Sequence, residues 1–211
     1  MGPSGEGTLM FIEEPQRRLI IVGVDESAEA AAAARWAVRE AELRKEDLLL
    51  VHAYEVPNMP SRGRAAAIAR GRQEGLALLD KVASTLTVPP TMHLDRLVEI
   101  DSPEALLSRR SGKADLTVLG QDHPAFSEHM PLGHTASTVA SMARHPVVAV
   151  PRGWTARVDD RRLIAVAIDG QHPSSNTLGM RSQKRACAKS QCWWCTLPRW
   201  TSWGPESRTP G

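Results

Sequence analysis

The chain has 211 residues, 42% of them hydrophobic and 24% charged, and a formal net charge of +2 at pH 7. This length holds one ordinary α/β domain and part of a second, and the composition is that of a soluble globular protein. No apolar run approaches the ~20 residues that a membrane helix needs. The segment 1–11 has neither a basic start nor a long apolar stretch, so we expect a cytoplasmic protein with no membrane partner.

Charge and cysteine are concentrated near the end of the chain. Residues 180–211 hold six of the 26 basic and one of the 24 acidic residues, so 1–179 carries a net charge of −3. A nucleic-acid partner is therefore not expected. All three cysteines (Cys187, Cys192 and Cys195) lie in this tail, so the body offers no disulfide framework. Their spacing lacks a fourth zinc ligand, and His123, His129 and His134 fit no standard ligand motif, so no metal is expected.

The first part of the chain predicts a leader followed by strand, helix and strand. Residues 1–16 are rich in Gly, Pro and Glu and are expected to be disordered. Leu19–Val24 is a continuous apolar run, typical of a strand buried on both faces. Asp25, Glu26 and Ser27 suit a turn and a helix N-cap, and the Ala-rich segment 28–45 predicts the helix. A second buried strand is expected over 48–53.

The middle of the chain continues the same alternation. Pro57 and Pro60 mark a loop before a long helical segment, 62–86, which Pro89-Pro90 stops. A weaker strand is expected over 92–100. Ser102-Pro103 begins a helix with proline at its first position, and Gly112 closes it after Ser111. The run 114–120 predicts a further apolar strand.

The last elements of the domain follow a loop. Residues 121–132 are rich in Pro and His, a helix of small residues is expected over 133–144, and 147–150 predicts the fifth strand. Strands that alternate with helices form right-handed βαβ units. The expected fold is α/β, an open parallel five-stranded sheet with helices on both faces. Ligands of such Rossmann-like sheets bind beyond the carboxyl ends of the strands, here near Asp25, His52 and Gly120.

An internal repeat suggests a second domain. The segment 17–25 (RRLIIVGVD) returns as 161–169 (RRLIAVAID), with six of nine positions identical. We expect a domain over 17–152, a linker over 153–160, the start of a truncated second copy over 161–179, and an atypical, disordered tail over 180–211. The abrupt change after Gly179 is what a shifted reading frame would produce. Reading the next frame beyond codon 179 for the missing helix and strand tests this hypothesis.

Several segments in order resemble the universal stress protein family. They are the strand that ends at Asp25, the strand 114–120, the helix that begins at Gly133, and the final strand of 145–151 (HPVVAVP). The resemblance covers 17–152 and the fragment 161–179. It implies a tandem-domain member cut short, with an adenine nucleotide alpha hydrolase-like fold.

The resemblance also implies a phosphate loop. Nucleotide-binding members have Gly, two residues, Gly, nine residues, Gly, and then Ser or Thr. Glycines let backbone N–H groups approach phosphates, and the helix N-terminus stabilises their charge. This chain keeps Gly120 and Gly133, but His123 stands at the middle glycine and His134 at the hydroxyl position. Thr135, just beyond, is expected to supply a hydroxyl.

Other residues have two interpretations each. By resemblance, Asp25 contacts the nucleoside end of the ligand, and otherwise it is a turn residue that caps the first helix. Val51 either flanks the base with His52 or packs in the core. Gly120 and Gly133 are either phosphate-loop glycines or ordinary turn glycines. The expected nucleotide contacts are therefore Asp25, Val51, Gly120, His123, Gly133, His134 and Thr135.

Two functions follow from these residues. The first is the binding of ATP or another adenine nucleotide, in a stress response or in signalling. The second is a ligand-free interaction domain that forms a homodimer through an edge such as strand 147–150, with a degenerate loop. No catalytic triad, Cys/His pair or carboxylate pair indicates an enzyme, and weak ATP hydrolysis is the only activity considered.

Overall fold

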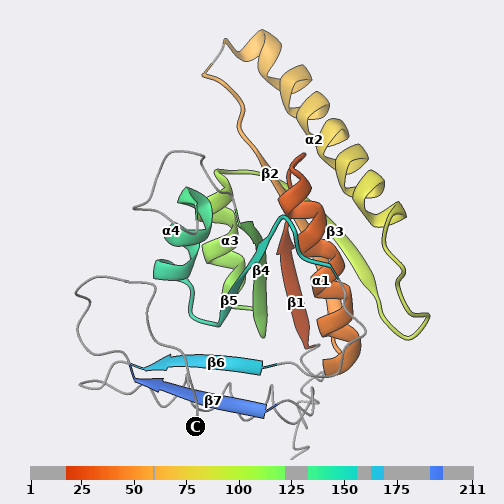
Figure 1. Ribbon diagram of the computed structural model, residues 1–211. Helices are drawn as coiled ribbons and strands as arrows, with labels where there is room; N and C mark the ends of the chain where they lie inside the picture. The colour runs from red at the N-terminus through yellow and green to blue at the C-terminus, as the bar shows by residue number, and fades with distance from the viewer. Residues whose placement is uncertain (1–17, 59, 122–132, 156–162, 169–190, 197–211) are drawn as a thin grey trace, which may run out of the picture. The chain divides into compact units, whose positions relative to one another are not determined.

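Five parallel strands form one sheet in the order β3-β2-β1-β4-β5 (Figure 1). The register is continuous across the centre, where Ile21 of β1 lies opposite Leu49 on one side and Thr117 on the other. The predicted fold class, an α/β domain with an open five-stranded parallel sheet, is confirmed. The strands are β1 Leu19–Gly23, β2 Asp47–Tyr54, β3 Leu94–Ile100, β4 Leu116–Gln121 and β5 Val147–Pro151.

This computed structural model describes residues 18–58, 60–121 and 133–155, and the backbone alone of 163–168 and 191–196. The chain divides into two compact units, Met1–Thr155 and Ala156–Gly211. The sheet and the helices below belong to the first unit.

Four helices cover the two faces of the sheet. The chain steps from β1 to β2 to β3 in one direction and then returns to β4 and β5 on the other side of β1. Right-handed crossovers therefore place the first two helices on one face and the last two on the opposite face, as Figure 1 shows. These helices are α1 Ala28–Arg44, α2 Ser61–Ser84, α3 Pro103–Ser111 and α4 His134–Met142.

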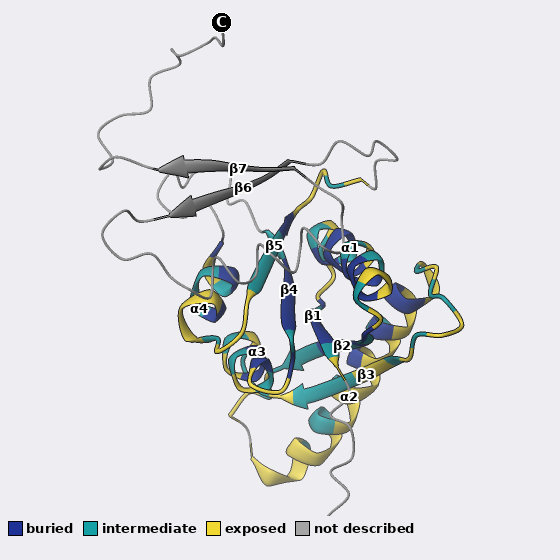
Figure 2. Ribbon diagram, turned by 90° about the horizontal axis from the view of Figure 1, so that it is seen from below, coloured by how far each residue is buried: buried dark blue, intermediate teal, exposed yellow. Residues whose placement is uncertain are grey.

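The core consists of the apolar runs of the central strands. The ribbon of these strands is dark blue in Figure 2 where their residues are buried. Burying such side chains contributes about 1.5–3 kcal/mol each, so these runs are the main source of the domain's stability. Completely buried side chains include Ile20, Val22, Leu48, Leu50, Leu116 and Val118.

Local signals in the sequence set the helix ends. Ser27 caps α1, since its Oγ accepts a hydrogen bond from Ala30 N at 3.0 Å. The helix ends at Lys45, whose left-handed φ of 57° lets its N–H reach the carbonyl groups of the last turn. Ser102 caps α3 in the same way as Ser27 caps α1, and Gly133 precedes α4.

Some predicted boundaries differ from the observed ones by a few residues. The helix predicted over 62–86 spans Ser61–Ser84. The strand predicted from Met92 begins at Leu94, because Met92 N donates to Pro89 O in a turn. The strand predicted from Ala114 begins at Leu116, because Ala114 N still donates to Ser111 O at the end of α3.

The second unit contains two described strands. β6 Leu163–Ile168 and β7 Gln191–Thr196 pair in parallel, with Leu163 opposite Gln191. β6 coincides with the strand expected from the internal repeat. β7 lies within 180–211, where the sequence shows no clear periodicity.

Within the described residues, none of the helices combines the length and the apolar character that crossing a lipid bilayer requires.

Candidate functional site

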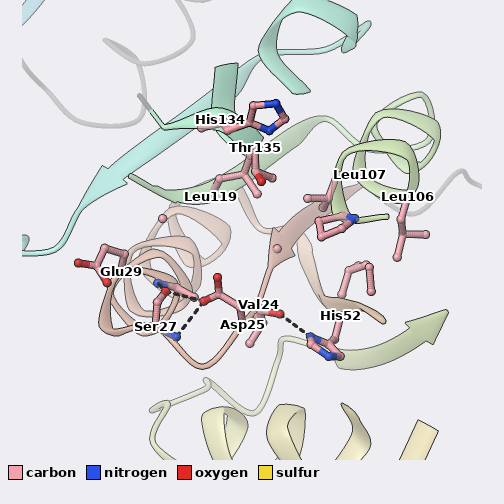
Figure 3. A pocket seen from close by; sticks show the side chains of 17 residues that line it. Val24, Asp25, Ser27, Glu29, His52, Leu106, Leu107, Leu119, His134 and Thr135 are labelled. Atoms are coloured by element: carbon pink, nitrogen blue, oxygen red, sulfur yellow. Dashed lines mark hydrogen bonds between the residues drawn. The ribbon is translucent and has the colours of Figure 1, made fainter. Parts of the chain in front are cut away.

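A pocket of about 280 Å³ opens at the carboxyl ends of β1, β2 and β4 (Figure 3). The N-termini of α1 and α4 border it, and α3 supplies an apolar wall with Leu106 and Leu107. This is the edge of the sheet where the strand order reverses. β2 and then β3 lie on one side of β1, and β4 and then β5 lie on the other. The volume approaches the range of about 300–1,000 Å³ that is usual for small-molecule sites.

Five of the seven residues predicted for the site line this one pocket: Asp25, Val51, Gly120, His134 and Thr135. A sixth, Gly133, immediately precedes the lining residues of α4. The seventh, His123, lies outside the described residues, as does His129. The pocket thus brings together residues more than 100 positions apart in the sequence.

Asp25 is tied to the start of α1. Its Oδ1 accepts hydrogen bonds from the backbone N–H of Ser27 at 2.9 Å and from the Ser27 hydroxyl (Figure 3). Ser27 Oγ in turn accepts from Ala30 N. Asp25 therefore stabilises the turn that leads into α1. Among the described residues its second oxygen, Oδ2, has no partner, so the carboxylate keeps one acceptor for another molecule.

Gly120 is needed for close packing. A Cβ atom built there would lie 2.6 Å from the carbonyl carbon of Glu29 and 2.8 Å from Ala30 N. The end of β4 therefore touches the first turn of α1 backbone to backbone, and any side chain at position 120 would push the two apart. This contact holds one wall of the pocket in place.

Gly133 is needed for its backbone conformation. Its φ of 78° and ψ of 165° are costly for any residue with a side chain. This conformation turns the chain into α4, whose first N–H groups have no acceptor within the helix. His134, Thr135 and Ala136 of this first turn all line the pocket, so the positive end of the α4 dipole is directed towards it.

Glu104, which was not predicted for the site, meets this helix end. Its Oε1 accepts a hydrogen bond from Thr135 Oγ1 at 2.6 Å and lies 3.5 Å from His134 Nδ1. The hydrogen bond from Thr135 lowers the pKa of the Glu104 carboxyl, although burial acts in the opposite direction. The sequence marks Glu104 only as an acidic residue in the first turn of α3. Its partner is 31 positions away, so no local spacing reveals the contact.

His52 links the ends of β1 and β2. Its Nδ1 lies 2.8 Å from Val24 O (Figure 3). A carbonyl oxygen can only accept, so Nδ1 carries the proton in this contact. The ring is packed on α2 as well, because a Cβ at Gly75 would lie 2.9 Å from His52 Cδ2. Val51, beside it, is 2% exposed and belongs to the core, and it also lines the pocket.

The charged lining of the pocket is acidic. Asp25 and Glu29 line it, whereas the described lining includes no Lys or Arg. Arg152 lies nearby, with its Nε 3.6 Å from Glu29 Oε1, and its side chain is 75% exposed. Among the described residues, no group of three or more His, Cys, Asp or Glu side chains is placed to hold a metal ion.

Most of the first unit is similar in sequence to known proteins. The model of the universal stress protein family matches residues 16–151. Universal stress protein Rv2623 of Mycobacterium tuberculosis is 31% identical over 144 residues, which are 67% of this chain and 48% of that protein. The chain spans about half the length of the curated relatives it matches.

The chain is also similar to solved structures. The structure described as hypothetical protein MJ0577 has a TM-score of 0.51 at 15% identity, over 67% of this chain and all of that one. A universal stress protein family protein from Arabidopsis thaliana with AMP bound has a TM-score of 0.43 at 14% identity, over 64% of this chain and 92% of that one.

Proposed function

Because this chain belongs to the universal stress protein family, we propose that its first unit binds ATP or another adenine nucleotide and acts in a stress response or in signalling. One observation carries the proposal. A single pocket at the carboxyl edge of the sheet joins a carboxylate with a spare acceptor, an apolar wall and the open N-terminus of α4. These three features match the ribose, the base and the phosphate of a nucleotide, respectively.

Each predicted residue has a role in this proposal. Asp25 accepts hydrogen bonds from ribose hydroxyls through Oδ2, and Val51 flanks the base. Gly120 and Gly133 shape the walls, and the first turn of α4, with His134 and Thr135, faces the phosphate. His123 is proposed as a further contact on the basis of the family resemblance alone. ATP is the adenine nucleotide that we propose as the ligand, and the sequence indicates no requirement for a metal.

We propose a binding module and not an enzyme. Hydrolysis needs a base positioned to activate a nucleophile. The Ser27 hydroxyl makes hydrogen bonds with Asp25 and with the α1 backbone, which is a capping arrangement. His52 makes a hydrogen bond with Val24 O. Neither pair among the described lining residues resembles a nucleophile with its base, so at most weak ATP hydrolysis is expected.

Calorimetric titration of ATP and AMP into the purified full chain tests the proposal. Gly133→Asp adds a side chain where φ is 78° and a negative charge at the α4 N-terminus, and it should abolish binding. Gly153→Asp is the matched control, because a Cβ at Gly153 meets nothing within 4 Å. Absence of binding to the unaltered chain, or equal binding by Gly133→Asp, would contradict the proposal.

A second candidate is self-association without a ligand. β5 is at one edge of the five-stranded sheet and pairs with β4 alone among its strands. Edge strands present unpaired backbone groups to other chains. Sedimentation of the purified chain distinguishes the candidates. A stable homodimer that binds no adenine nucleotide would favour this second function, and a monomer that binds one would favour the first.

Two further features belong to the proposal. The repeat at 161–169 supports a tandem arrangement in which a second, incomplete copy of the domain begins after the first. The proposed compartment is the cytoplasm, since a site for adenine nucleotides is of use where these ligands are present.

A further inference from the structure

Glu104 places a negative charge at the helix end that the proposed function assigns to phosphate. It is the second residue of α3, and its carboxylate reaches across to α4, where Oε1 lies 2.6 Å from Thr135 Oγ1. The same oxygen lies 3.5 Å from His134 Nδ1. An internal anion thus already interacts with the first turn of α4.

This contact also engages a donor that a phosphate would need. A threonine hydroxyl has a single proton, and that of Thr135 is donated to Glu104. It cannot be donated to a phosphate oxygen at the same time. The pKa of Glu104 is lowered mainly by this hydrogen bond, so the carboxylate is ionised at neutral pH.

Apart from His52 and His134, the described lining holds no basic side chain to compensate for this charge. Asp25 and Glu29 are the carboxylates of the lining itself, and Glu104 reaches the lining residues His134 and Thr135. Arg152, the nearby cation, is paired with Glu29. No Lys or Arg of the described lining is therefore placed to neutralise the additional charge of a triphosphate.

We propose that Glu104 makes this pocket select adenine nucleotides of low phosphate charge, so that a monophosphate binds more tightly than a triphosphate. The inference rests on the proposed function and specifies its ligand. Two like charges about 5 Å apart in a water-like dielectric weaken binding by about fourfold, and more where the dielectric is lower. Each phosphate group beyond the first adds negative charge, so the discrimination grows from AMP to ADP to ATP.

Calorimetric titration of adenosine, AMP, ADP and ATP tests this, with EDTA present so that no divalent cation masks the phosphate charge. The unaltered chain should bind AMP at least fivefold more tightly than ATP. Glu104→Gln removes the charge, and its amide oxygen can still accept from Thr135. This variant should bind ATP at least fivefold more tightly than the unaltered chain does, with a smaller gain for AMP and no change for adenosine.

Glu42→Gln is the matched control, because Glu42 is an exposed carboxylate near the other end of α1. It should leave all four affinities unchanged. Raising the salt concentration should narrow the ratio between AMP and ATP in the unaltered chain, because salt screens the repulsion.

Two outcomes would overturn the inference while leaving the proposed function intact. One is tighter binding of ATP than of AMP by the unaltered chain. The other is an equal effect of Glu104→Gln on all four ligands. If none of the four binds to either protein, the proposed function itself fails and the selectivity fails with it.

Discussion

Gly120 and Glu29 are in backbone contact: a Cβ at position 120 would lie 2.6 Å from the carbonyl carbon of Glu29. The end of β4 and the first turn of α1 are therefore held at a distance that only glycine permits. Because both residues line the pocket, the packing of the fold and the shape of the candidate site depend on the same contact.

Gly120→Ala should destabilise the domain. The added methyl group meets backbone atoms, which cannot move aside as the end of a side chain can, and overpacking of this kind costs about 1–3 kcal/mol. Urea unfolding measures the loss, with Gly153→Ala as the neutral control. Nucleotide affinity should fall in the same variant, since α1 must shift. A stability within error of the unaltered chain would show that the contact is looser than described.

Gly133→Ala should also destabilise, for a different reason. A residue with a Cβ atom is strained at a φ of 78°, at a cost of about 1–2 kcal/mol. Gly112→Ala is the control, because Gly112 ends α3 at a φ of −64° and its Cβ would lie 3.7 Å from the nearest atom. It should be neutral or stabilise by about 0.4–1 kcal/mol. Thermal unfolding of both variants checks the difference, and equal effects would contradict it.

The fold is predictable from the sequence because its main signals are local. Leu19–Gly23 and Leu116–Gln121 are strands rich in apolar residues, and Ser27 and Ser102 start helices by capping them. Boundaries are less predictable. The turn at Met92 depends on a single hydrogen bond to Pro89 O, which hydrophobic periodicity does not encode.

The candidate site is predictable only in part. Asp25 and Gly120 follow from their places at strand ends, and Gly133 from the spacing of the family's loop. Glu104 does not follow, because its contact with Thr135 depends on how α3 and α4 pack together. The close approach of Gly120 to α1 is likewise a property of the assembled sheet and helix.

Ser27→Ala should lower both stability and nucleotide affinity. Loss of an N-cap hydroxyl costs about 1 kcal/mol. The substitution also removes the hydrogen bond from the Ser27 hydroxyl to Asp25, and only the one from the backbone N–H of residue 27 remains. Ser102→Ala is the matched variant, because Ser102 Oγ caps α3 by accepting from Ala105 N at 3.2 Å. It should lose similar stability, and nucleotide binding should be retained. Chemical unfolding measures the loss of stability, and calorimetry measures the nucleotide affinity. Equal nucleotide affinities in the two variants would show that Asp25 does not contact the nucleotide.

Glu46 should make the domain less stable as the pH rises. Its side chain is completely buried, and burial raises the pKa of its carboxyl above 4.5. Arg18 Nη2 lies 2.9 Å from Oε1, but the two are not aligned as a hydrogen bond. The folded state therefore holds this proton to a higher pH than the unfolded state does. The contribution of Glu46 to stability is present below pH 4.5 and is lost as the pH rises through the folded pKa.

Unfolding free energies at a series of pH values, for the unaltered chain and for Glu46→Gln, measure this effect. The difference, unaltered minus variant, should become more negative as the pH rises above 4.5. Glu104→Gln should show the opposite sign, because the pKa of Glu104 is lowered and its contribution is lost as the pH falls below 4.5. The pH profiles of the two variants thus serve as controls for each other. Parallel pH profiles for the two variants would contradict the assignment of burial to Glu46 and of the Thr135 hydrogen bond to Glu104.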